Sequence, residues 1–381
     1  MKRIISVISA VLLTAGLHFP VAYATDIPEV SARAAVVISA DTGEIIYSKN
    51  CEEKLPMAST TKIMTALLCI ESGNLDEPFV VDSKAIHVEG SSMGLQEGDI
   101  VTKYALCCGM LLPSGNDAAN AAAVKIAGSN ERFAEIMNAR AQQMGLSKTY
   151  FVTPSGLEGD GHGSSAYDMA VLSSHALRNK VFRDICSCEN IKLEFGNPPY
   201  TRWLRNTNKL LSLYGGTYGV KTGFTDEAGR CLVSACERGD LNLICVTLND
   251  RNDWDDHMNM YDYAFERVHT IHPELPEDLS IPLAGSDKDY IKVRPSALPE
   301  PVTVLEADEK KLTYTVISPL FIYAPVKTGD ELGELSIRYD GNEIRRIPLN
   351  ASEDAEYSDI SEKAGRGTIN NIISKLRKLF S

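Results

Sequence analysis

The stretch LPMASTTKIMTALLCIESG, residues 55–73, places a serine and a lysine at the front of an apolar run. Residues 60–72 are mostly apolar, which predicts a buried helix rather than an amphipathic surface helix. Residues at i and i+3 share one face of a helix, so the Lys62 side chain can reach back to the Ser59 oxygen. Either Ser59 caps the helix beside a solvated lysine, or Ser59 is a nucleophile and Lys62 is its base. The apolar surroundings favour the second interpretation, because burial lowers the pKa of an ammonium group and a base must be neutral.

Two later motifs supply the other groups that a serine nucleophile needs. The segment LLPSGNDAAN places Ser114 and Asn116 in a loop that opens a helix, where a hydroxyl can relay a proton and an amide can hold a carbonyl. The segment GVKTGFT places Lys221, Thr222 and Gly223 on a strand, where they suit a terminal carboxylate and an approaching peptide backbone. Turn chemistry or edge-strand solubility would explain either segment alone. The ordered set S-x-x-K, S-x-N and K-T-G instead indicates catalysis.

The pattern around these motifs predicts an α+β fold. Residues 34–39 and 44–48 are short apolar runs around a turn and predict a β-hairpin. The spacing of apolar residues further along the chain predicts helices at 116–128, 130–144 and 254–268. It also predicts strands at 228–237 and 241–249. We therefore expect one antiparallel sheet that the hairpin opens, a large helical insertion interrupts and the late strands complete.

The composition changes after Pro273. The proline-rich stretch IHPELPEDLSIPL predicts a linker, and short β-type runs then predict a small all-β domain at residues 279–350. Residues 351–364 are acidic and polar, which predicts a flexible spacer. Residues 365–381 carry apolar side chains at helical spacing among Lys375, Arg377 and Lys378. This pattern predicts a basic amphipathic helix in the plane of a membrane surface, and the alternative is a helix docked on its own β domain.

The first 24 residues have the pattern of a secretory signal peptide. Lys2 and Arg3 precede a short apolar run, and small residues at Ala22–Ala24 suit a cleavage site. A retained N-terminal anchor is the alternative. We expect residues 25–272 to form an exported catalytic domain at the outer face of a bacterial cytoplasmic membrane.

Composition narrows the possible partners. The chain has 381 residues, which predicts about two domains, and a net charge of −13, which argues against binding of nucleic acid. No pair of its nine cysteines has CxxC spacing, so we expect buried free thiols and no metal or cofactor. A bridge between Cys186 and Cys188, or one involving Cys107 or Cys108, stays open.

On the three motifs the chain resembles the low-molecular-weight penicillin-binding proteins, specifically the serine-type D-alanyl-D-alanine carboxypeptidases of peptidase family S11. The segments SSMGLQEGD (91–99), PSGLEGDGHGSSAYDMA (154–170) and NTNKLL (206–211) are also similar to that family. The resemblance runs through residues 30–270 and more loosely through the β domain and tail. It implies a β-lactamase/transpeptidase-like sheet. It also implies removal of the terminal D-alanine from peptidoglycan stem pentapeptides through an acyl-serine intermediate, and acylation by β-lactam antibiotics.

The resemblance further implies a role for each site residue. Ser59 would attack the carbonyl between the terminal D-alanines, Lys62 would be the base and Ser114 would relay the proton. The backbone N–H groups of Ser59 and Phe224 would form the oxyanion hole. His162 and Asp168 are expected to brace the helical insertion. Substrate would be bound by Asn116, Lys221, Thr222, Gly223, Phe224 and Arg251.

The same residues leave alternatives to the carboxypeptidase open. A transpeptidase shares the acyl-enzyme and differs only in its acceptor. Weak β-lactamase activity is a further alternative, although Gly115 replaces the aspartate of the S-D-N motif and EFGN at 194–197 is one residue short of the deacylation spacing. An inactive peptidoglycan-binding protein would have no need to keep Ser59, Lys62 and Lys221 together.

Overall fold

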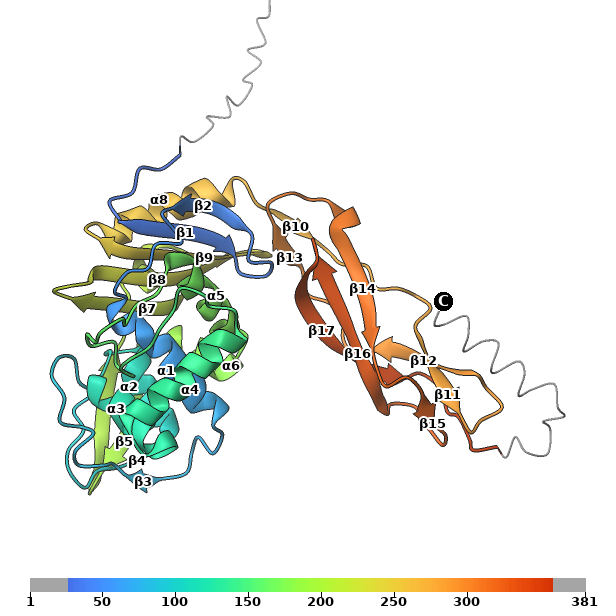
Figure 1. The fold of residues 1–381 in the computed structure, drawn as a ribbon, viewed down its shortest axis with the longest axis horizontal. Coiled ribbons are helices and arrows are strands. Elements are labelled where there is room, and N and C mark those ends of the chain that lie inside the picture. Colours follow the sequence, from blue (N-terminus) through green and yellow to red (C-terminus); the bar gives the residue numbers. More distant parts are fainter. Residues whose placement is uncertain (1–26, 359–381) are drawn as a thin grey trace, which may run out of the picture.

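The fold is known from a computed structural model that describes residues 27–358 (Figure 1). The predicted signal peptide and the predicted anchor helix both lie outside the described residues. Two sets of core residues divide the rest of the chain. Buried apolar residues from Val30 to Val268 form an N-terminal unit, and those from Ile271 to Ala355 form a C-terminal unit.

The predicted antiparallel sheet is present in the N-terminal unit. Five strands lie in the order β2-β1-β9-β8-β7, so β7 is an edge strand. The hairpin and the late strands pair as expected, because β1 lies between β2 and β9. The strands are β1 (Ala34–Ser39), β2 (Ile45–Lys49), β7 (Thr217–Thr225), β8 (Gly229–Arg238) and β9 (Leu241–Asp250).

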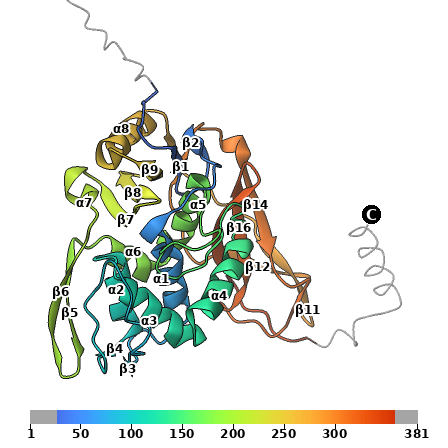
Figure 2. The same ribbon diagram turned by 60° about the vertical axis from the view of Figure 1, so that its left-hand side comes forward.

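Helices cover both faces of this sheet (Figures 1 and 2). Side chains alternate along β1, so Ala35 and Val37 pack with Tyr261 of α8 (Asp253–Phe265), while Val36 and Ile38 face the helical insertion. The insertion holds α1 (Lys62–Glu71), α2 (Lys103–Leu111), α3 (Asn116–Ala127), α4 (Asn130–Gln143), α5 (Ala166–Leu177), α6 (Lys180–Cys186) and α7 (Leu210–Leu213). It also holds two small hairpins, built from β3 (Phe79–Val80) with β4 (Ile100–Val101) and β5 (Asn190–Gly196) with β6 (Pro199–Arg205).

Helix α1 is the buried helix that the opening stretch predicts. Every residue from Lys62 to Ile70 is buried. The first turn differs from the prediction, because residues Ala58–Thr61 form a separate 3-10 helix, η1, in front of α1. Ser59 and Lys62 therefore lie on either side of a junction between two helix types.

The C-terminal unit is all-β, as predicted. Its main sheet has the order β14-β16-β17-β12-β11-β15, and a two-stranded sheet pairs β10 with β13. The strands are β10 (His269–Ile271), β11 (Ser280–Ala284), β12 (Tyr290–Pro295), β13 (Val302–Val304), β14 (Leu312–Ile317), β15 (Ile322–Tyr323), β16 (Glu331–Tyr339) and β17 (Asn342–Ala351), with a 3-10 helix, η2 (Glu309–Lys311), before β14.

The segment predicted as a flexible spacer starts inside this unit. Ala351 ends β17 and is fully buried, and Ala355 is buried and pairs with Val326. The Ser358 N–H donates to the Gly285 carbonyl at 2.9 Å. Ala351 and Ala355, which lie among acidic residues, pack in the core of this unit. The mostly polar composition of the segment does not predict this packing.

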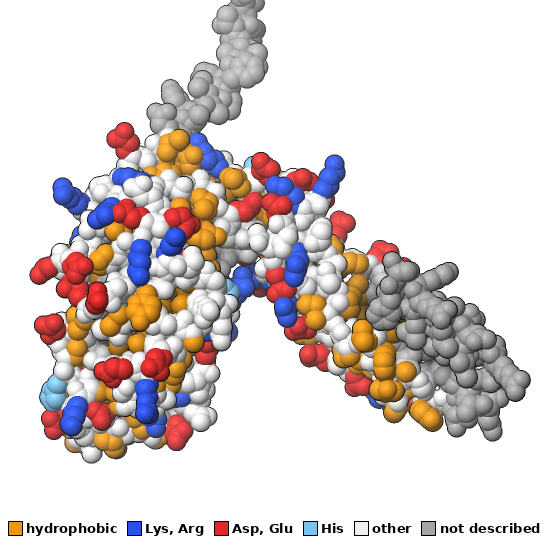
Figure 3. Space-filling model, in the orientation of Figure 1, with side chains coloured by type: hydrophobic (Ala, Val, Ile, Leu, Met, Phe, Trp, Pro, Cys, Tyr) orange, Lys and Arg blue, Asp and Glu red, His pale blue; other side chains and the backbone are white. Residues whose placement is uncertain are grey.

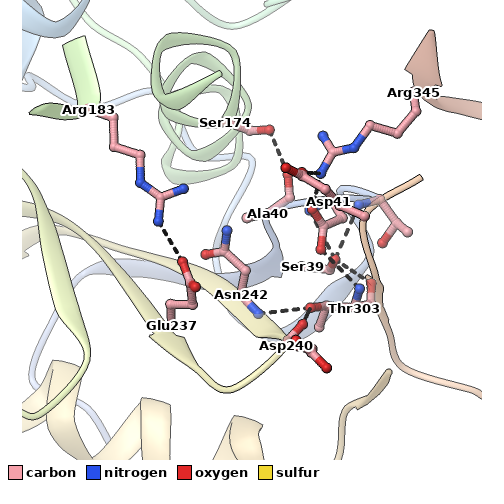
Figure 4. A network of polar contacts seen from close by, with 12 residues as sticks. Ser39, Ala40, Asp41, Ser174, Arg183, Glu237, Asp240, Asn242, Thr303 and Arg345 are labelled. Atoms are coloured by element: carbon pink, nitrogen blue, oxygen red, sulfur yellow. Dashed lines mark hydrogen bonds and ion pairs between the residues drawn. The ribbon is translucent and has the colours of Figure 1, made fainter. Parts of the chain in front are cut away.

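The two units meet at a buried polar junction (Figure 4). Asp41, in the β1–β2 turn, accepts from the Thr303 N–H at 2.9 Å and pairs with Arg345 of β17 at 3.4 Å. The Ser39 hydroxyl donates to the Thr303 carbonyl at 2.6 Å, and the Asn242 N–H donates to the Thr303 hydroxyl at 2.8 Å. Strand β13 is thereby hydrogen-bonded to the end of the N-terminal sheet.

All nine cysteines lie within the described residues and all are free, as the sequence predicts. Most are buried in the core, where burial raises the pKa of the thiol, for example at Cys231 to about 12. Within residues 27–358, no helix combines the length and the apolar character that crossing a membrane requires.

Candidate active site

Ser59 lies at the floor of a cleft between η1, the start of α3 and the edge strand β7. The other three residues of η1 are buried, and Ser59 alone in that turn is partly exposed. Ala58 just before it has a φ of 47°, in the left-handed region that disfavours residues with a Cβ atom. The cleft has a volume of about 290 Å³ and is lined by Ser59, Ser91, Ser114, Thr207, Thr222, Gly223, Phe224, Arg230, Asp253 and Trp254.

The Lys62 amine makes three short hydrogen bonds. Its Nζ lies 2.8 Å from Ser59 Oγ, 2.7 Å from Asn116 Oδ1 and 2.6 Å from the Ser155 carbonyl oxygen. An amide oxygen and a carbonyl oxygen can only accept. A neutral amine must therefore direct both its N–H bonds to Asn116 and Ser155, which leaves its lone pair toward the Ser59 hydroxyl. This geometry orients Lys62 as a base for Ser59.

Burial also adjusts the charge of the two lysines near the cleft. Lys62 is completely buried, and this burial, with the Lys221 ammonium nearby, lowers the pKa of Lys62 well below its ordinary value, while Asp117 acts in the opposite direction. Burial alone lowers the pKa of Lys221 to about 7. The Lys221 Nζ donates to the Thr222 carbonyl at 2.7 Å. The lowered pKa of Lys62 favours the neutral amine that a general base requires.

The S-x-N motif forms a tight loop at the start of α3. Ser114 lines the cleft with a φ of 66°, and the Asn116 amide is fixed because its Nδ2 donates to the Glu89 carbonyl at 2.7 Å. A Cβ atom at Gly115 would lie 2.6 Å from Asp117 Oδ1 and 2.8 Å from the Met93 nitrogen. The loop therefore excludes a side chain at the position where the S-D-N motif has aspartate.

Asp117 holds the loop that forms the wall opposite β7. Its carboxylate accepts from the Ser92 hydroxyl at 2.6 Å and from the backbone N–H groups of Met93, Gly94 and Leu95 at 2.9–3.1 Å. Ser91, the residue before Ser92, lines the cleft, and its backbone carbonyl accepts from the Asn116 N–H at 2.7 Å. The sequence motifs do not assign this role to Asp117, and its position next to Asn116 is the one local signal for it.

The K-T-G segment forms the other wall. Because β7 is the edge strand, one side of its backbone has no partner strand in the described sheet and faces the cleft. A Cβ atom at Gly223 would lie 3.1 Å from the Met57 carbonyl oxygen and from the Ser59 and Thr60 nitrogens, so a side chain here would crowd the contact between β7 and η1. Thr222 shares a 2.7 Å hydrogen bond with Thr207, and Phe224 is 63% exposed at the rim. Eight of the nine predicted site residues therefore meet around Ser59.

Arg251 is the exception. It follows β9 with an exposed side chain and does not line the cleft. Its place near the cleft is taken by Arg230, which lies opposite Phe224 in the β7–β8 pairing. The Arg230 guanidinium donates to Asp253 at 2.6 Å and lies 5.4 Å from the Trp254 ring centroid. Arg230 belongs to no sequence motif and was therefore not predicted. The register between β7 and β8 alone brings Arg230 to the site.

Comparison with known proteins leads to the same family that the sequence motifs resemble. A family model described as D-alanyl-D-alanine carboxypeptidase, peptidase family S11, matches residues 21–252. The chain belongs to this family. A second family model, described as the C-terminal domain of penicillin-binding protein 5, matches residues 270–357. The protein is therefore a serine hydrolase of the D-alanyl-D-alanine carboxypeptidase family and a penicillin-binding protein that acts on cell-wall peptidoglycan.

Relatives in other bacteria match across most of the carboxypeptidase. It is 34% identical over 337 residues to D-alanyl-D-alanine carboxypeptidase DacF of Bacillus subtilis, which covers 85% of each chain. It is 30% identical over 365 residues to DacC of Escherichia coli, with 89% of each covered. The crystal structure of DacD from Francisella tularensis aligns with a TM-score of 0.62 at 25% identity, over 87% of this chain and 95% of that one. The Streptomyces K15 DD-transpeptidase aligns with a TM-score of 0.60 at 30% identity, over 63% and 99%.

His162 and Asp168 lie behind the site of this carboxypeptidase, where they hold backbone. His162 Nδ1 accepts from the Val152 N–H at 2.9 Å, so its Nε2 faces Thr61 Oγ1 at 2.9 Å as a donor. Burial lowers the pKa of His162 to about 4, so the ring is neutral at physiological pH. Asp168 accepts from the Lys148 N–H and the Thr149 hydroxyl at 2.8 Å. Both residues brace the loops that flank η1.

The described part of the carboxypeptidase contains no group of three or more histidine, cysteine, aspartate or glutamate residues that could hold a metal ion.

Proposed function

We propose that this carboxypeptidase removes the terminal D-alanine of peptidoglycan stem pentapeptides with Ser59 as nucleophile and Lys62 as general base. The observation that carries the proposal is the lysine geometry. Two pure acceptors, on Asn116 and Ser155, take the N–H bonds of a neutral Lys62 and leave its lone pair for Ser59, 2.8 Å away. A hydroxyl next to a fixed, desolvated amine is an activated nucleophile.

The acylation step then follows from the positions of these groups. The Ser59 proton passes to Lys62 Nζ as the Ser59 oxygen attacks the carbonyl carbon of the penultimate D-alanine. The backbone N–H groups of Ser59 and Phe224 donate hydrogen bonds to the oxyanion and stabilise its developing negative charge. Ser114 then relays the proton from Lys62 to the leaving amine, the peptide C–N bond breaks, and D-alanine departs. Water completes the cycle by hydrolysing the acyl-serine ester.

The terminal carboxylate of the substrate lies, in this proposal, at the β7 wall. Lys221 and the Thr222 hydroxyl contribute charge and a hydrogen bond. The Arg230 guanidinium adds a second cation, whose side chain lines the cleft and is 43% exposed. We assign this second cation to Arg230 rather than to Arg251. Phe224 at the rim and the glycine at 223 leave room for an extended peptide beside the edge strand.

The cellular position follows from the sequence at both ends of the chain. Residues 1–24 would direct export, and residues 365–381 would hold the enzyme at the outer face of the cytoplasmic membrane by an in-plane amphipathic helix. Residues 25–272 would form the catalytic domain and residues 279–350 the β domain that separates it from the anchor. The cell-wall substrate is consistent with this location.

The first prediction tests the nucleophile. Ser59→Ala should lower the rate of D-alanine release at least about a thousandfold and abolish covalent labelling by penicillin, because no oxygen remains to form the ester. Mass spectrometry of the full chain with a muramyl pentapeptide ending in D-Ala-D-Ala, with and without a D-amino acid acceptor, measures both outcomes. Penicillin labelling of the variant would contradict the assignment. If the unaltered enzyme instead transfers the acyl group mainly to the D-amino acid and not to water, it is a transpeptidase.

The second prediction tests the carboxylate site. Arg230→Gln should raise KM for the pentapeptide about tenfold, because a charge-assisted hydrogen bond to the carboxylate is lost. The effect should vanish for a substrate whose terminal carboxylate is amidated. Arg251→Gln is the matched control and should leave KM nearly unchanged. Because Asp253 loses its partner in the first variant, Arg230→Gln combined with Asp253→Asn checks that the change is not a collapse of α8. The reverse ranking of the two arginines would overturn the assignment.

A further inference from the structure

The outer edge of the C-terminal unit exposes a group of large apolar side chains. They are Tyr290, Leu320, Phe321, Tyr323 and Tyr357, each between 45% and 84% exposed, and we name this group the aromatic edge. Figure 3 shows hydrophobic side chains gathered at the end of the C-terminal unit that carries β11 and β15. Exposed aromatic clusters of this kind mark contact surfaces in soluble proteins.

Strand pairing places Tyr290 and Tyr323 of the aromatic edge on one face of the sheet. Tyr323 of β15 lies opposite Ala284 of β11, and Tyr290 of β12 lies opposite Pro282 of β11. Residues directly opposite each other point to the same side, and Pro282 and Ala284 are two apart on one strand. Tyr290 and Tyr323 therefore point the same way, while their buried neighbours Ile281 and Leu283 point into the core.

The remaining members continue this surface. The rings of Phe321 and Tyr323 meet edge to face with centroids 5.1 Å apart. Tyr357 lies against Gly285, where an added Cβ atom would be 3.5 Å from the tyrosine ring. The aromatic edge is thus a continuous surface on β12, β11 and β15, the last of which is an edge strand.

The described chain ends beside this surface. The Ser358 N–H donates to the Gly285 carbonyl, next to Tyr357. Residues 359–364 alone separate Ser358 from the amphipathic segment 365–381, and six residues span at most about 20 Å even when fully extended. Whatever surface holds segment 365–381 therefore also lies close to the aromatic edge.

The charged residues near the aromatic edge fit a lipid surface. Lys292 and Arg294 follow Tyr290 at alternate positions of β12, so both are exposed on the same face as the aromatic rings. Among the nearby acidic residues, Glu353 pairs with Lys288 at 2.7 Å and Glu356 pairs with Lys327 at 2.6 Å, while Asp287 and Asp289 are exposed. Tyrosine rings beside cations are typical of the interface between lipid headgroups and acyl chains.

We propose that the aromatic edge is a second membrane contact, which inserts Phe321, Tyr323 and Leu320 into the headgroup region of an anionic bilayer. The proposal rests on the proposed membrane anchor, because it is the anchor that brings this edge to the bilayer. With two contacts the β sheet is held at a fixed tilt, so the Ser59 cleft at the other end of the molecule faces the cell wall at a set height.

The test places a fluorescent probe in the edge. Tyr323→Trp in the full chain is mixed with vesicles of equal parts phosphatidylglycerol and phosphatidylcholine, with or without brominated acyl chains. We expect a blue shift and strong bromine quenching of the introduced indole, relative to the unaltered chain with its own Trp203 and Trp254. Leu298→Trp is the matched control, since Leu298 is 85% exposed in the same unit but outside the aromatic edge, and its indole should not be quenched.

A second measurement tests the strength of the contact. Phe321→Ser combined with Tyr323→Ser should weaken vesicle binding of the full chain about tenfold, while Leu298→Ser leaves binding unchanged. Deletion of 365–381 tests the anchor separately and should abolish stable binding.

The outcomes separate the two proposals. Vesicle binding that depends on 365–381 with an unquenched indole at position 323 overturns the aromatic edge and keeps the anchor. No vesicle binding by the full chain overturns both. An indole that is already blue-shifted without lipid, and that responds to deletion of 365–381, shows that the tail covers the edge and overturns the lipid contact. Self-association that the double serine variant abolishes assigns the edge to a second copy and also overturns it.

Discussion

Two lysines near one cleft need different charge states for acylation, one neutral and one positive. Lys62 must be neutral to accept the Ser59 proton, and burial with the Lys221 charge lowers its pKa well below the ordinary value. Lys221 must be protonated to attract a carboxylate, yet burial lowers its pKa to about 7. Activity should therefore rise with pH as Lys62 loses its proton and fall again as Lys221 loses its own.

This argument makes the third prediction. The profile of kcat/KM against pH should be bell-shaped, with an alkaline limb that begins near pH 7, because kcat/KM reports the free enzyme. Lys221→Arg keeps the positive charge at all accessible pH values and should move the alkaline limb upward by at least about one pH unit. The penicillin acylation rate, followed over the same pH range, checks the profile without peptide substrate. An alkaline limb that stays in place in Lys221→Arg would show that another group titrates there.

At the scale of elements, the loop before α3 is built around the space that Gly115 leaves. Gly115 has a φ of −57°, so no backbone strain requires glycine there, and crowding by Asp117, Met93 and Gly109 is the sole restriction.

The fourth prediction is that Gly115→Asp lowers the free energy of unfolding by about 1–3 kcal/mol and slows acylation, because the added carboxyl displaces Asp117 from the 91–95 loop. Gly215→Asp is the control, since nothing lies within 4 Å of a Cβ atom there. Thermal unfolding and penicillin labelling measure both effects, and equal stability of the two variants would contradict the crowding argument.

Elements that follow from local sequence pattern were predictable, and positions that depend on strand register were not. The hairpin, the buried α1 and the ordered motifs gave the sheet plan and eight residues of the candidate site. Arg251 does not line the cleft, because proximity in sequence to β9 does not decide which side chains reach the cleft. Arg230 reaches it because β8 pairs with β7 so that Arg230 faces Phe224. Asp117 and Ser155 were likewise missed as partners of the site, since their contacts join segments far apart in the chain.

At the scale of the whole molecule, the junction between the two units fixes how the cleft stands relative to the C-terminal sheet. Asp41 is central, because its carboxylate is 9% exposed and pairs with both the Thr303 N–H and Arg345 across the junction. Removing it leaves a buried N–H and a partly buried guanidinium without this acceptor, which costs about 1–3 kcal/mol.

The fifth prediction follows from this arrangement. Asp41→Ala should split thermal unfolding, seen by calorimetry, into two transitions, one for each unit, because each has its own core and the junction couples them. Turnover of a soluble pentapeptide should stay within about twofold, since no junction residue touches the Ser59 cleft.

Glu334→Ala removes an ion pair with Arg346 that lies within the C-terminal unit and is largely exposed, so this control should leave a single transition at nearly unchanged temperature. If Asp41→Ala also unfolds in one step at the original temperature, the junction is not what joins the units. For the membrane anchor proposed above, a fixed junction would hold the cleft at one height above the bilayer, whereas a hinged junction would let the cleft sample many heights.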